Sequence, residues 1–399
     1  MKQFLLRGQQ LVTIAFLEGQ LKRLPNLIEG EDALLQVPSV LQNQSLKHVL
    51  VVTTAGFIRR GTLKPFFETL TNQGIAYTIY SKVIPDPDIA CVEKGYKLYY
   101  QNGCDTIVAI GGGSAMDCAK IIGARVANPD KTVEDMTGNI KIRKNLPPFF
   151  AVPTTAGSGS EVTAGAVITE PAGSRKYPIF DFVLMPTYAV LDPKLLLDLP
   201  PFMTAASGMD ALTHAVEAYT NKFHHKAAAD YAKKAVSLIM ANLEKAVVNG
   251  QNLYARHQML KGSYYAGIAF NVALVGYVHA ISHGIGGRYH LQHGQINASL
   301  LPLVLEAYGK AAHKSLADLA DLVGLSGQTE ADKAQAFIQK IRDLRSAINL
   351  PAGIPDIQEA DIADLAAGAE KEGNPTYPTP VTWQQADFEI ILRKVKAEH

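Results

Sequence analysis

The stretch that most constrains the fold is Cys104 to Ala127, where a strand-like run meets a glycine-rich turn. The apolar run CDTIVAI leads directly into GGGS and then into the helical sequence AMDCAKIIGARVA. Two similar strand-like runs precede it, at Lys47 to Thr53 and at Ile75 to Tyr80, with a helical segment between them. Strands that alternate with helices are typical of a parallel sheet covered by helices. We therefore expect an α/β domain in the first half of the chain.

The GGGS turn is a candidate phosphate site. Ser114, followed three residues later by Asp117, matches a capping pattern and predicts that the helix starts here. The free N–H groups at the start of this helix would then lie next to glycines, where no Cβ blocks the approach of a phosphate. The helix dipole would also favour negative charge at this end. GGGS is not the GxGxxG fingerprint, and glycine-rich turns after strands also occur for geometric reasons alone.

A second loop of similar character follows the next predicted strand. Phe149 to Val152 reads as a buried strand, and it opens into the hydroxyl- and glycine-rich sequence PTTAGSGS at residues 153–160. Ligands of open α/β sheets bind at the carboxyl ends of the strands. Two such loops at one edge predict a dinucleotide.

The hydrophobic periodicity changes after Asp192-Pro193, and from Thr204 onward it is helical. Helices are expected at residues 204–220, 226–248, 252–269, 273–284, 296–310, 312–323, 329–348, 358–369 and 383–396. A chain of 399 residues exceeds the usual single core. We expect three parts: an N-terminal extension at 1–24, an α/β dinucleotide-binding domain at 25–195, and an all-α metal-binding and substrate domain at 196–399.

Four of the eleven histidines lie between Gly276 and His293. His279 and His283 are four residues apart and would share one face of a helix. The glycines at 284, 286 and 287 are expected to end that helix and to return the chain toward His290 and His293. This density of imidazoles requires a chemical explanation.

A second pair lies upstream, where Asp210 and His214 are also spaced i, i+4. A single histidine on an apolar face is more often a core residue bonded to a carbonyl. Two helical faces that present a carboxylate and imidazoles nevertheless suit a divalent transition metal. The sequence predicts a metal site built from Asp210, His214 and at least one of His279, His283 and His293, and spacing alone does not choose among these three.

Composition excludes some classes of function. The net charge of +1, with no stretch where basic and aromatic residues alternate, disfavours nucleic-acid binding. The three cysteines, Cys91, Cys104 and Cys118, fit neither a disulfide framework nor a zinc motif and suggest a reducing, cytoplasmic location.

Residues 1–24 read as an amphipathic helix. Their longest apolar run, Leu11 to Leu17, is far shorter than the roughly 20 residues that span a bilayer, and no signal-peptide cleavage site follows. We expect this helix to pack on its own body or on a neighbouring subunit. The alternative is a membrane-surface anchor formed by Phe4, Leu5, Val12 and Phe16, flanked by Lys2, Arg7, Lys22 and Arg23.

Four motifs in order, GGGSAMD, PTTAGSGSE, GMDALTHAVEAY and HAISHGIGGRYHLQHGQINASLLP, make the chain similar to the iron-dependent (group III) alcohol dehydrogenases over roughly residues 25 to 399. The resemblance implies a Rossmann-like N-terminal domain and a helical C-terminal domain, the dehydroquinate synthase-like fold, with the active site in the cleft between them. It also implies the metal ligands Asp210, His214, His279 and His293, and a substrate-pocket role for His283. The implied cofactor contacts are Gly112, Gly113, Ser114, Thr154, Thr155, Ser158 and Lys176, with Asp117 near the nicotinamide.

The resemblance implies a reversible oxidation of a primary alcohol to an aldehyde by hydride transfer to NAD or NADP, with Fe(II) as the metal, although zinc or manganese would fit similar ligands. His283 would relay the proton. Thr54 stands where NAD-preferring members have an aspartate, so NADP is not repelled. We expect a small alcohol or aldehyde as substrate and a homo-oligomer, as a dimer.

Two alternatives explain less of the sequence. A dehydroquinate-synthase-like lyase that uses NAD transiently needs a cationic pocket, whereas Phe270, Val272 and Leu274 are apolar residues close to the histidines in sequence. A non-catalytic metal-binding scaffold would account for the histidines but not for two phosphate loops.

Overall fold

A computed structural model describes residues 2–170, 176–223 and 226–398. The chain divides into two compact units, one formed by Arg23–Asp198 and the other by Met1–Lys22 together with Leu199–His399. The division thus falls three residues beyond the expected boundary at 195, and the start of the chain belongs to the helical unit.

The α/β unit is built on a parallel sheet of six strands in the order β1-β9-β6-β4-β2-β3. Its strands are β1 (Asn26–Glu29), β2 (His48–Val52), β3 (Ala76–Tyr80), β4 (Thr106–Gly111), β6 (Phe149–Pro153) and β9 (Tyr188–Leu191). A smaller sheet contains β5 (Gly138–Asn139), β7 (Gly165–Thr169) and β8 (Lys176–Phe180). The strands predicted at 47–53, 75–80, 104–110 and 149–152 are confirmed.

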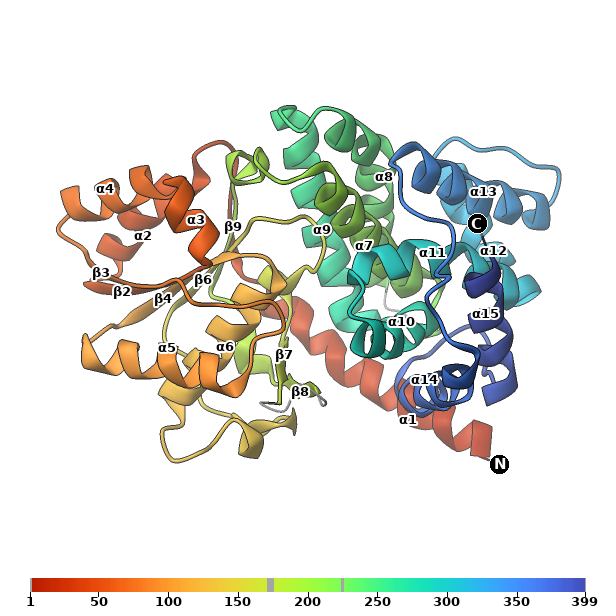
Figure 1. Ribbon diagram of the computed structural model, residues 1–399, viewed down its shortest axis with the longest axis horizontal. Helices are drawn as coiled ribbons and strands as arrows, with labels where there is room; N and C mark the ends of the chain where they lie inside the picture. Colours follow the sequence, from red (N-terminus) through yellow and green to blue (C-terminus); the bar gives the residue numbers. More distant parts are fainter. Residues whose placement is uncertain (1, 171–175, 224–225, 399) are drawn as a thin grey trace. The chain divides into compact units, whose positions relative to one another are not determined.

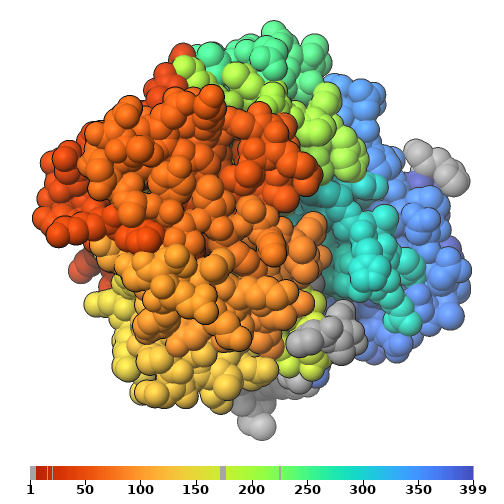
Figure 2. All heavy atoms as spheres, turned by 60° about the vertical axis from the view of Figure 1, so that its left-hand side comes forward, coloured from red at the N-terminus to blue at the C-terminus, as the bar shows by residue number. Residues whose placement is uncertain are grey.

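Helices cover both faces of the large sheet (Figure 1). They are α2 (Val37–Asn43), α3 (Ala55–Arg60), α4 (Lys64–Asn72), α5 (Ile89–Gln101) and α6 (Gly113–Ala127). Every residue of β4 and β6 is buried, as expected of strands at the centre of a doubly covered sheet. The residues of this unit form a continuous outer surface, red to yellow in Figure 2.

The strand order places the two glycine loops at the functional edge of the sheet. From β2 the chain moves outward to β3 and then returns to β4 on the other side of β2, so the order reverses between β2 and β4. Ligands of open α/β sheets bind outside the carboxyl ends of the strands at such a reversal. The turns after β2, β4 and β6 all lie at that edge because these strands are parallel neighbours.

The second unit consists of helices and connecting loops, and its described residues, 2–22, 199–223 and 226–398, contain no strand. Its helices are α7 (Pro201–Thr220), α8 (Lys226–Val248), α9 (Leu253–Ala273), α10 (Tyr277–Tyr289), α11 (His293–Tyr308), α12 (His313–Leu322), α13 (Glu330–Ala347), α14 (Ile362–Thr376) and α15 (Gln385–Ala397). Each corresponds to one predicted helix, with ends that differ by up to seven residues.

One of these differences corrects a prediction about the glycines of α10. The helix does not end at Gly284 but continues to Tyr289, and the left-handed residue after it is His290, with φ of 55°. A Cβ on Gly284 would lie 3.2 Å from Leu365 Cδ2, and one on Gly286 would lie 3.6 Å from Ile296 Cδ1. The close approach of α14 accounts for Gly284, whereas the distance at Gly286 is an ordinary van der Waals contact. The packing of α10 on α14 and α11 offsets the weak helix propensity of the glycines.

The helix α1 (Lys2–Leu17) opens the chain and is followed by a short 3-10 turn, Glu18–Lys22. It packs against α9 and α14 with Gln10, Ile14 and Leu17 buried. Leu11 and Val12 are 50% and 70% exposed, while the side chains of Lys2, Phe4, Leu5 and Phe16 lie outside the described part of the structure. Among the described helices none is by itself long and apolar enough to cross a bilayer; α9 and α10 reach that length only as a pair bent by 104°.

Candidate functional site

The first glycine loop begins α6, but not in the way that the sequence predicted. The N-cap is Gly112, in extended conformation and without a side-chain cap, and Ser114 already lies in the first helical turn. The predicted capping pair is therefore wrong. Asp117 instead accepts hydrogen bonds from Ser160 Oγ at 2.9 Å and from the backbone N–H of Val167 at 3.0 Å. The carboxylate thus fastens α6 to the segment that follows the second loop.

The two predicted phosphate loops touch each other. A Cβ on Gly112 would lie 3.4 Å from Thr155 Oγ1, and a Cβ on Gly113 would lie 3.2 Å from Ser158 Oγ. The backbone N–H of Thr154 donates to the carbonyl of Gly111 at 3.0 Å. A side chain at Gly113 would crowd the neighbouring loop, and one at Gly112 would be in van der Waals contact with it. The structure thus brings together the residues at 112, 113, 154, 155 and 158 that the sequence singled out.

A buried lysine that sequence reasoning missed lies behind these loops. Lys120 is fully buried on α6, and its Nζ donates to Ser160 Oγ, to the carbonyl and hydroxyl of Thr163, and to the carbonyl of Gly165 at 2.8 to 3.3 Å. Burial lowers the pKa of Lys120 to about 8. The local signal for this residue is weak, because a lysine in a helix is usually solvated.

The remaining predicted cofactor residues lie at the ends of strands. Thr54 follows β2 as the N-cap of α3, in extended conformation, and forms an isolated bridge with Lys82. Lys176 begins β8, but its side chain lies outside the described part of the structure.

Three of the four predicted metal ligands converge in the helical unit. Asp210 from α7, His279 from α10 and His293 from the first turn of α11 each offer one ligand atom, and these atoms all lie within 4.8 Å of one another. Asp210 Oδ1 is 3.7 Å from His279 Nε2 and 3.5 Å from His293 Nε2. The arrangement assembles one carboxylate and two imidazoles from three different helices.

The distances between these ligand atoms suit side chains that share a metal ion better than side chains that hydrogen-bond to each other. They exceed a hydrogen bond, whereas ligands at about 2.1 Å around a tetrahedral metal lie about 3.4 Å apart. Asn297, one turn after His293 on α11, donates from Nδ2 to Asp210 Oδ1 at 2.8 Å, and its buried Oδ1 has no hydrogen-bond partner in the described structure. The residues present therefore fit a divalent metal with mixed nitrogen and oxygen ligands.

His214, the fourth predicted ligand, lies beside this group. Its Nε2 is 4.0 Å from Asp210 Oδ1, and its ring stacks on His279 at 4.5 Å and on Phe270 at 4.2 Å. Burial alone would raise the pKa of Asp210, but the imidazoles of His214 and His293 lower it below the usual range of a carboxyl group. Asp210 is therefore a carboxylate, as a metal ligand must be.

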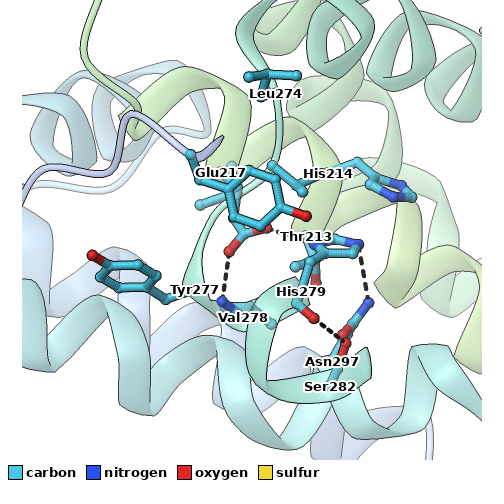
Figure 3. Close-up of polar contacts among 12 residues, drawn as sticks. Thr213, His214, Glu217, Leu274, Tyr277, Val278, His279, Ser282 and Asn297 are labelled. Atoms are coloured by element: carbon cyan, nitrogen blue, oxygen red, sulfur yellow. Dashed lines mark hydrogen bonds and ion pairs between the residues drawn. The ribbon is translucent and has the colours of Figure 1, made fainter. Parts of the chain in front are cut away.

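A buried glutamate orients His279 (Figure 3). Glu217 Oε2 accepts from His279 Nδ1 at 2.6 Å, and Oε1 accepts from the backbone N–H of Val278 at 2.8 Å. Nε2 of the same ring faces Asp210 Oδ1 at 3.7 Å and lies 3.4 Å from Asn297 Nδ2. Burial lowers the pKa of His279, but Glu217 and Asp210 outweigh it and raise the pKa to about 9. Partners of this kind fix the ring and tautomer of metal-binding histidines.

His283 has different surroundings from His279, although the two share a helix face. Its side chain is 47% exposed, and its Nδ1 bonds to Glu372 Oε1 at 2.7 Å. Its ring stacks on His293 with centroids 5.4 Å apart and planes 13° apart. His283 therefore borders the candidate metal site without belonging to the group of three ligands.

The residues that the sequence reasoning missed differ in how easily they could have been found. Glu217 lies seven residues after Asp210, and Asn297 lies four residues after His293, so helical spacing places each near a predicted ligand. Glu372 lies 89 residues from His283, and no local pattern connects the two.

The known proteins that resemble this chain share both units. Residues 25–193 match the iron-containing alcohol dehydrogenase family, and residues 204–395 match the C-terminal domain of the same family. The chain belongs to the iron-containing alcohol dehydrogenase family. The predicted family, fold and enzyme class, an alcohol dehydrogenase, are thereby confirmed, and the lyase and scaffold alternatives are not favoured.

Among its relatives, the NAD-dependent methanol dehydrogenase of Bacillus methanolicus is 37% identical over 349 residues, which cover 86% of this chain and 91% of that protein. The 1,3-propanediol dehydrogenase of Klebsiella pneumoniae is 37% identical over 371 residues, covering 92% and 95%. Among solved structures, a 1,3-propanediol oxidoreductase has a TM-score of 0.90 at 36% identity, covering 93% of this chain and 98% of that one. A sulfoacetaldehyde reductase from Bifidobacterium kashiwanohense in complex with NAD+ has a TM-score of 0.85 at 27% identity, covering 94% and 97%.

Proposed function

We propose that this alcohol dehydrogenase oxidises a short primary alcohol reversibly to an aldehyde, with a divalent metal and with NAD or NADP as hydride acceptor. The observation that carries the proposal is the convergence of the Asp210 carboxylate with the Nε2 atoms of His279 and His293. The relatives named for methanol and 1,3-propanediol support a small substrate.

The residues that would hold the metal are Asp210, His214, His279 and His293. A divalent metal held there would polarise the substrate oxygen, and a nicotinamide bound at the glycine loops would accept the hydride. We propose Fe(II) as the native metal because the family is iron-containing and mixed nitrogen and oxygen ligation suits it, while zinc and manganese fit similar ligands.

The side chains of this chain would supply orientation and proton transfer. Glu217 holds Nδ1 of His279, so Nε2 is the ring nitrogen that would face the metal, and the burial of His279 and Asp210 keeps bulk water from both. His283 is proposed to carry the proton of the substrate hydroxyl at Nε2. Its Nδ1 is held by Glu372, so Nε2 is the ring nitrogen left for that exchange.

The dinucleotide is proposed to bind in the 25–195 region at Gly112, Gly113, Ser114, Asp117, Thr154, Thr155, Ser158 and Lys176. The mutual contact of the two loops supports this, because it leaves backbone at the edge of the sheet where a phosphate can approach. Thr54 is proposed to admit NADP as well as NAD, since it lacks the negative charge that would repel a 2′-phosphate.

The test is an assay of alcohols and aldehydes from one to about six carbons with both nicotinamides after anaerobic loading with Fe(II). We expect turnover with short primary alcohols, and its loss in His279→Ala. The matched control is His290→Asn, which changes an exposed histidine of the same motif at a left-handed position that asparagine tolerates. Absence of turnover in the loaded wild type, or equal losses in both variants, would contradict the proposal.

Three further expectations are also proposals. A homodimer is testable by light scattering coupled to size-exclusion chromatography. A cytoplasmic location is supported by the odd number of cysteines, all three buried as free thiols. Contact of α1 with a membrane surface is the weaker alternative to its packing on α9 and α14, because Gln10, Ile14 and Leu17 are buried in that packing.

A further inference from the structure

The N-terminal helix α1 is joined to the end of α14 by a buried glutamine. Gln10 is only 3% exposed, and its Nε2 donates to the backbone carbonyls of Asn374 and Tyr377, both at 2.9 Å. Its Oε1 accepts from Arg7 Nη1 at 2.9 Å, and Arg7 Nη2 donates to Thr382 Oγ1 at 3.1 Å. Every polar atom of the Gln10 amide group is therefore engaged with its surroundings or its helix neighbour.

These carbonyls lie at the C-terminal end of α14, where the helix itself provides no hydrogen-bond donors for them. The last carbonyls of a helix have no intrahelical N–H to accept from, and α14 ends at Thr376. Gln10 supplies donors to two carbonyls at this helix end, and the bond to Tyr377 is buried. The path of the chain from α14 into residues 377–384 is thus held in part from α1, which lies beside α14 (Figure 1).

The segment that Gln10 contacts is connected to His283 through two hydrogen bonds. The hydroxyl of Tyr377 donates to Glu372 Oε1 at 2.7 Å, and the same oxygen accepts from His283 Nδ1 at 2.7 Å. Burial raises the pKa of Glu372, but its bonds to His283 and Tyr377 outweigh this and lower it. The carboxylate thus accepts from both partners at once.

We propose that α1 is a positioning element of the active site, in which Gln10 fixes the Tyr377 segment and, through Tyr377 and Glu372, the ring of His283. The inference rests on the proposed function, because it concerns the histidine that would carry the proton. Gln10, Tyr377 and Glu372 are positioning residues. They act on the orientation of His283 and leave the nicotinamide loops and the metal ligands unchanged.

The first experiment compares Gln10→Ala with Gln9→Ala, its exposed neighbour on α1. In the metal-loaded enzyme we expect Glu372→Gln to lower kcat about tenfold, the lower end of the range for partners of metal-binding histidines. Gln10→Ala should lower kcat less, about fivefold, because Gln10 acts on His283 only through Tyr377 and Glu372. The KM for the nicotinamide and the bound metal should stay within about twofold of the wild type. Gln9→Ala should match the wild type in all three quantities.

A double-mutant cycle tests whether the effect passes through the histidine. If it does, Gln10→Ala lowers kcat in the wild type but not in a His283→Ala background. An equal loss in both backgrounds would overturn the proposal. Tyr377→Phe removes one hydroxyl and keeps the ring, so it serves as a control for general unfolding. We expect about a threefold loss of kcat with a melting temperature lowered by no more than about 4 °C, and an unaltered kcat would also overturn the proposal.

Amide hydrogen exchange read by mass spectrometry provides a readout that needs no turnover. Peptides that cover residues 374–383 should exchange faster in Gln10→Ala than in Gln9→Ala or the wild type, while peptides from α8 should not change. If the wild type oxidises no alcohol but this difference is found, the proposed function fails and the anchoring by α1 stands. Equal exchange in all three proteins overturns the anchoring itself.

Discussion

The glycine loops of the α/β unit and the histidine group of the helical unit use different parts of the chain: the first uses backbone groups and the second uses side chains. At Gly112 and Gly113 the site consists of backbone, and an added Cβ would lie 3.4 Å and 3.2 Å from the neighbouring loop. At Asp210 and His279 it consists of side chains whose orientation is set by buried partners such as Glu217. The comparison teaches that the loops should be sensitive to added volume, whereas the histidine group should be sensitive to the loss of a single acceptor or ligand.

The largest expected effect is at a metal ligand. His279→Ala should lower turnover by about 10³-fold and reduce bound metal, because a shell that has lost one of four ligands is incomplete. His283→Ala should keep the metal and lower kcat by about 10²-fold, the lower end of the range for a general acid or base. Elemental analysis beside steady-state kinetics checks both variants, and loss of metal from the second but not the first would reverse the assignment.

The next effect sharpens the comparison at an orienting partner. Glu217→Gln keeps the size of the side chain but offers one acceptor in place of two, so either His279 or Val278 loses its partner. We expect metal affinity to fall about 10- to 100-fold, measured by competition with a chelator of known affinity. Glu244→Gln on the exposed face of α8 serves as the control. Unchanged affinity in Glu217→Gln would mean that orientation by this carboxylate is unimportant.

Charge at Thr54, in the turn after β2, should have a comparable or smaller effect. Thr54→Asp would place a carboxylate near a 2′-phosphate at a cost of about 1–3 kcal/mol, or roughly 5- to 150-fold in affinity. We expect the wild type to use NADP no more than about tenfold less well than NAD, and the variant to shift strongly toward NAD. The ratio of kcat/KM values for the two nicotinamides decides this. A wild type that already rejects NADP by about a hundredfold would show that another group excludes the phosphate.

The smallest effect concerns volume alone. Gly113→Ala would bring a methyl group to 3.2 Å from Ser158 Oγ, and we expect it to raise the nicotinamide KM about tenfold while bound metal is unchanged. In Gly368→Ala, on the exposed face of α14, the methyl group would meet open space. That control should leave the KM unchanged and raise the free energy of unfolding by about 0.5–1 kcal/mol. Equal KM values in both variants would remove the contrast between the two regions.

The same contrast explains what the sequence could predict of the fold. Strands such as β4 and β6 are continuous apolar runs that are followed by glycine-containing loops, and these local signals located them to within two residues. The end of α10 was not predicted because glycine usually ends a helix, whereas here Gly284 allows close contact with α14 and the helix continues past Gly286 and Gly287. Tertiary packing of this kind leaves no local signature.

The candidate site likewise has features that the sequence could predict and features that it could not. The spacing of Asp210 and His214, together with the density of histidines after Gly276, is a local pattern that by itself predicts a metal-binding region. The partner of His283 could not be predicted, because Glu372 is brought to it by the packing of α14 on α10. Likewise Lys120 reads as an ordinary surface lysine, and only the fold encloses it.

The most direct test of the central claim is anomalous X-ray diffraction at the iron edge from crystals of the Fe(II)-loaded protein. The account predicts a single peak enclosed by Asp210, His214, His279 and His293, with His283 outside the coordination shell and still bonded to Glu372. A peak bound by His283 in place of one of these ligands, or full turnover in crystals without a peak at this position, would contradict it.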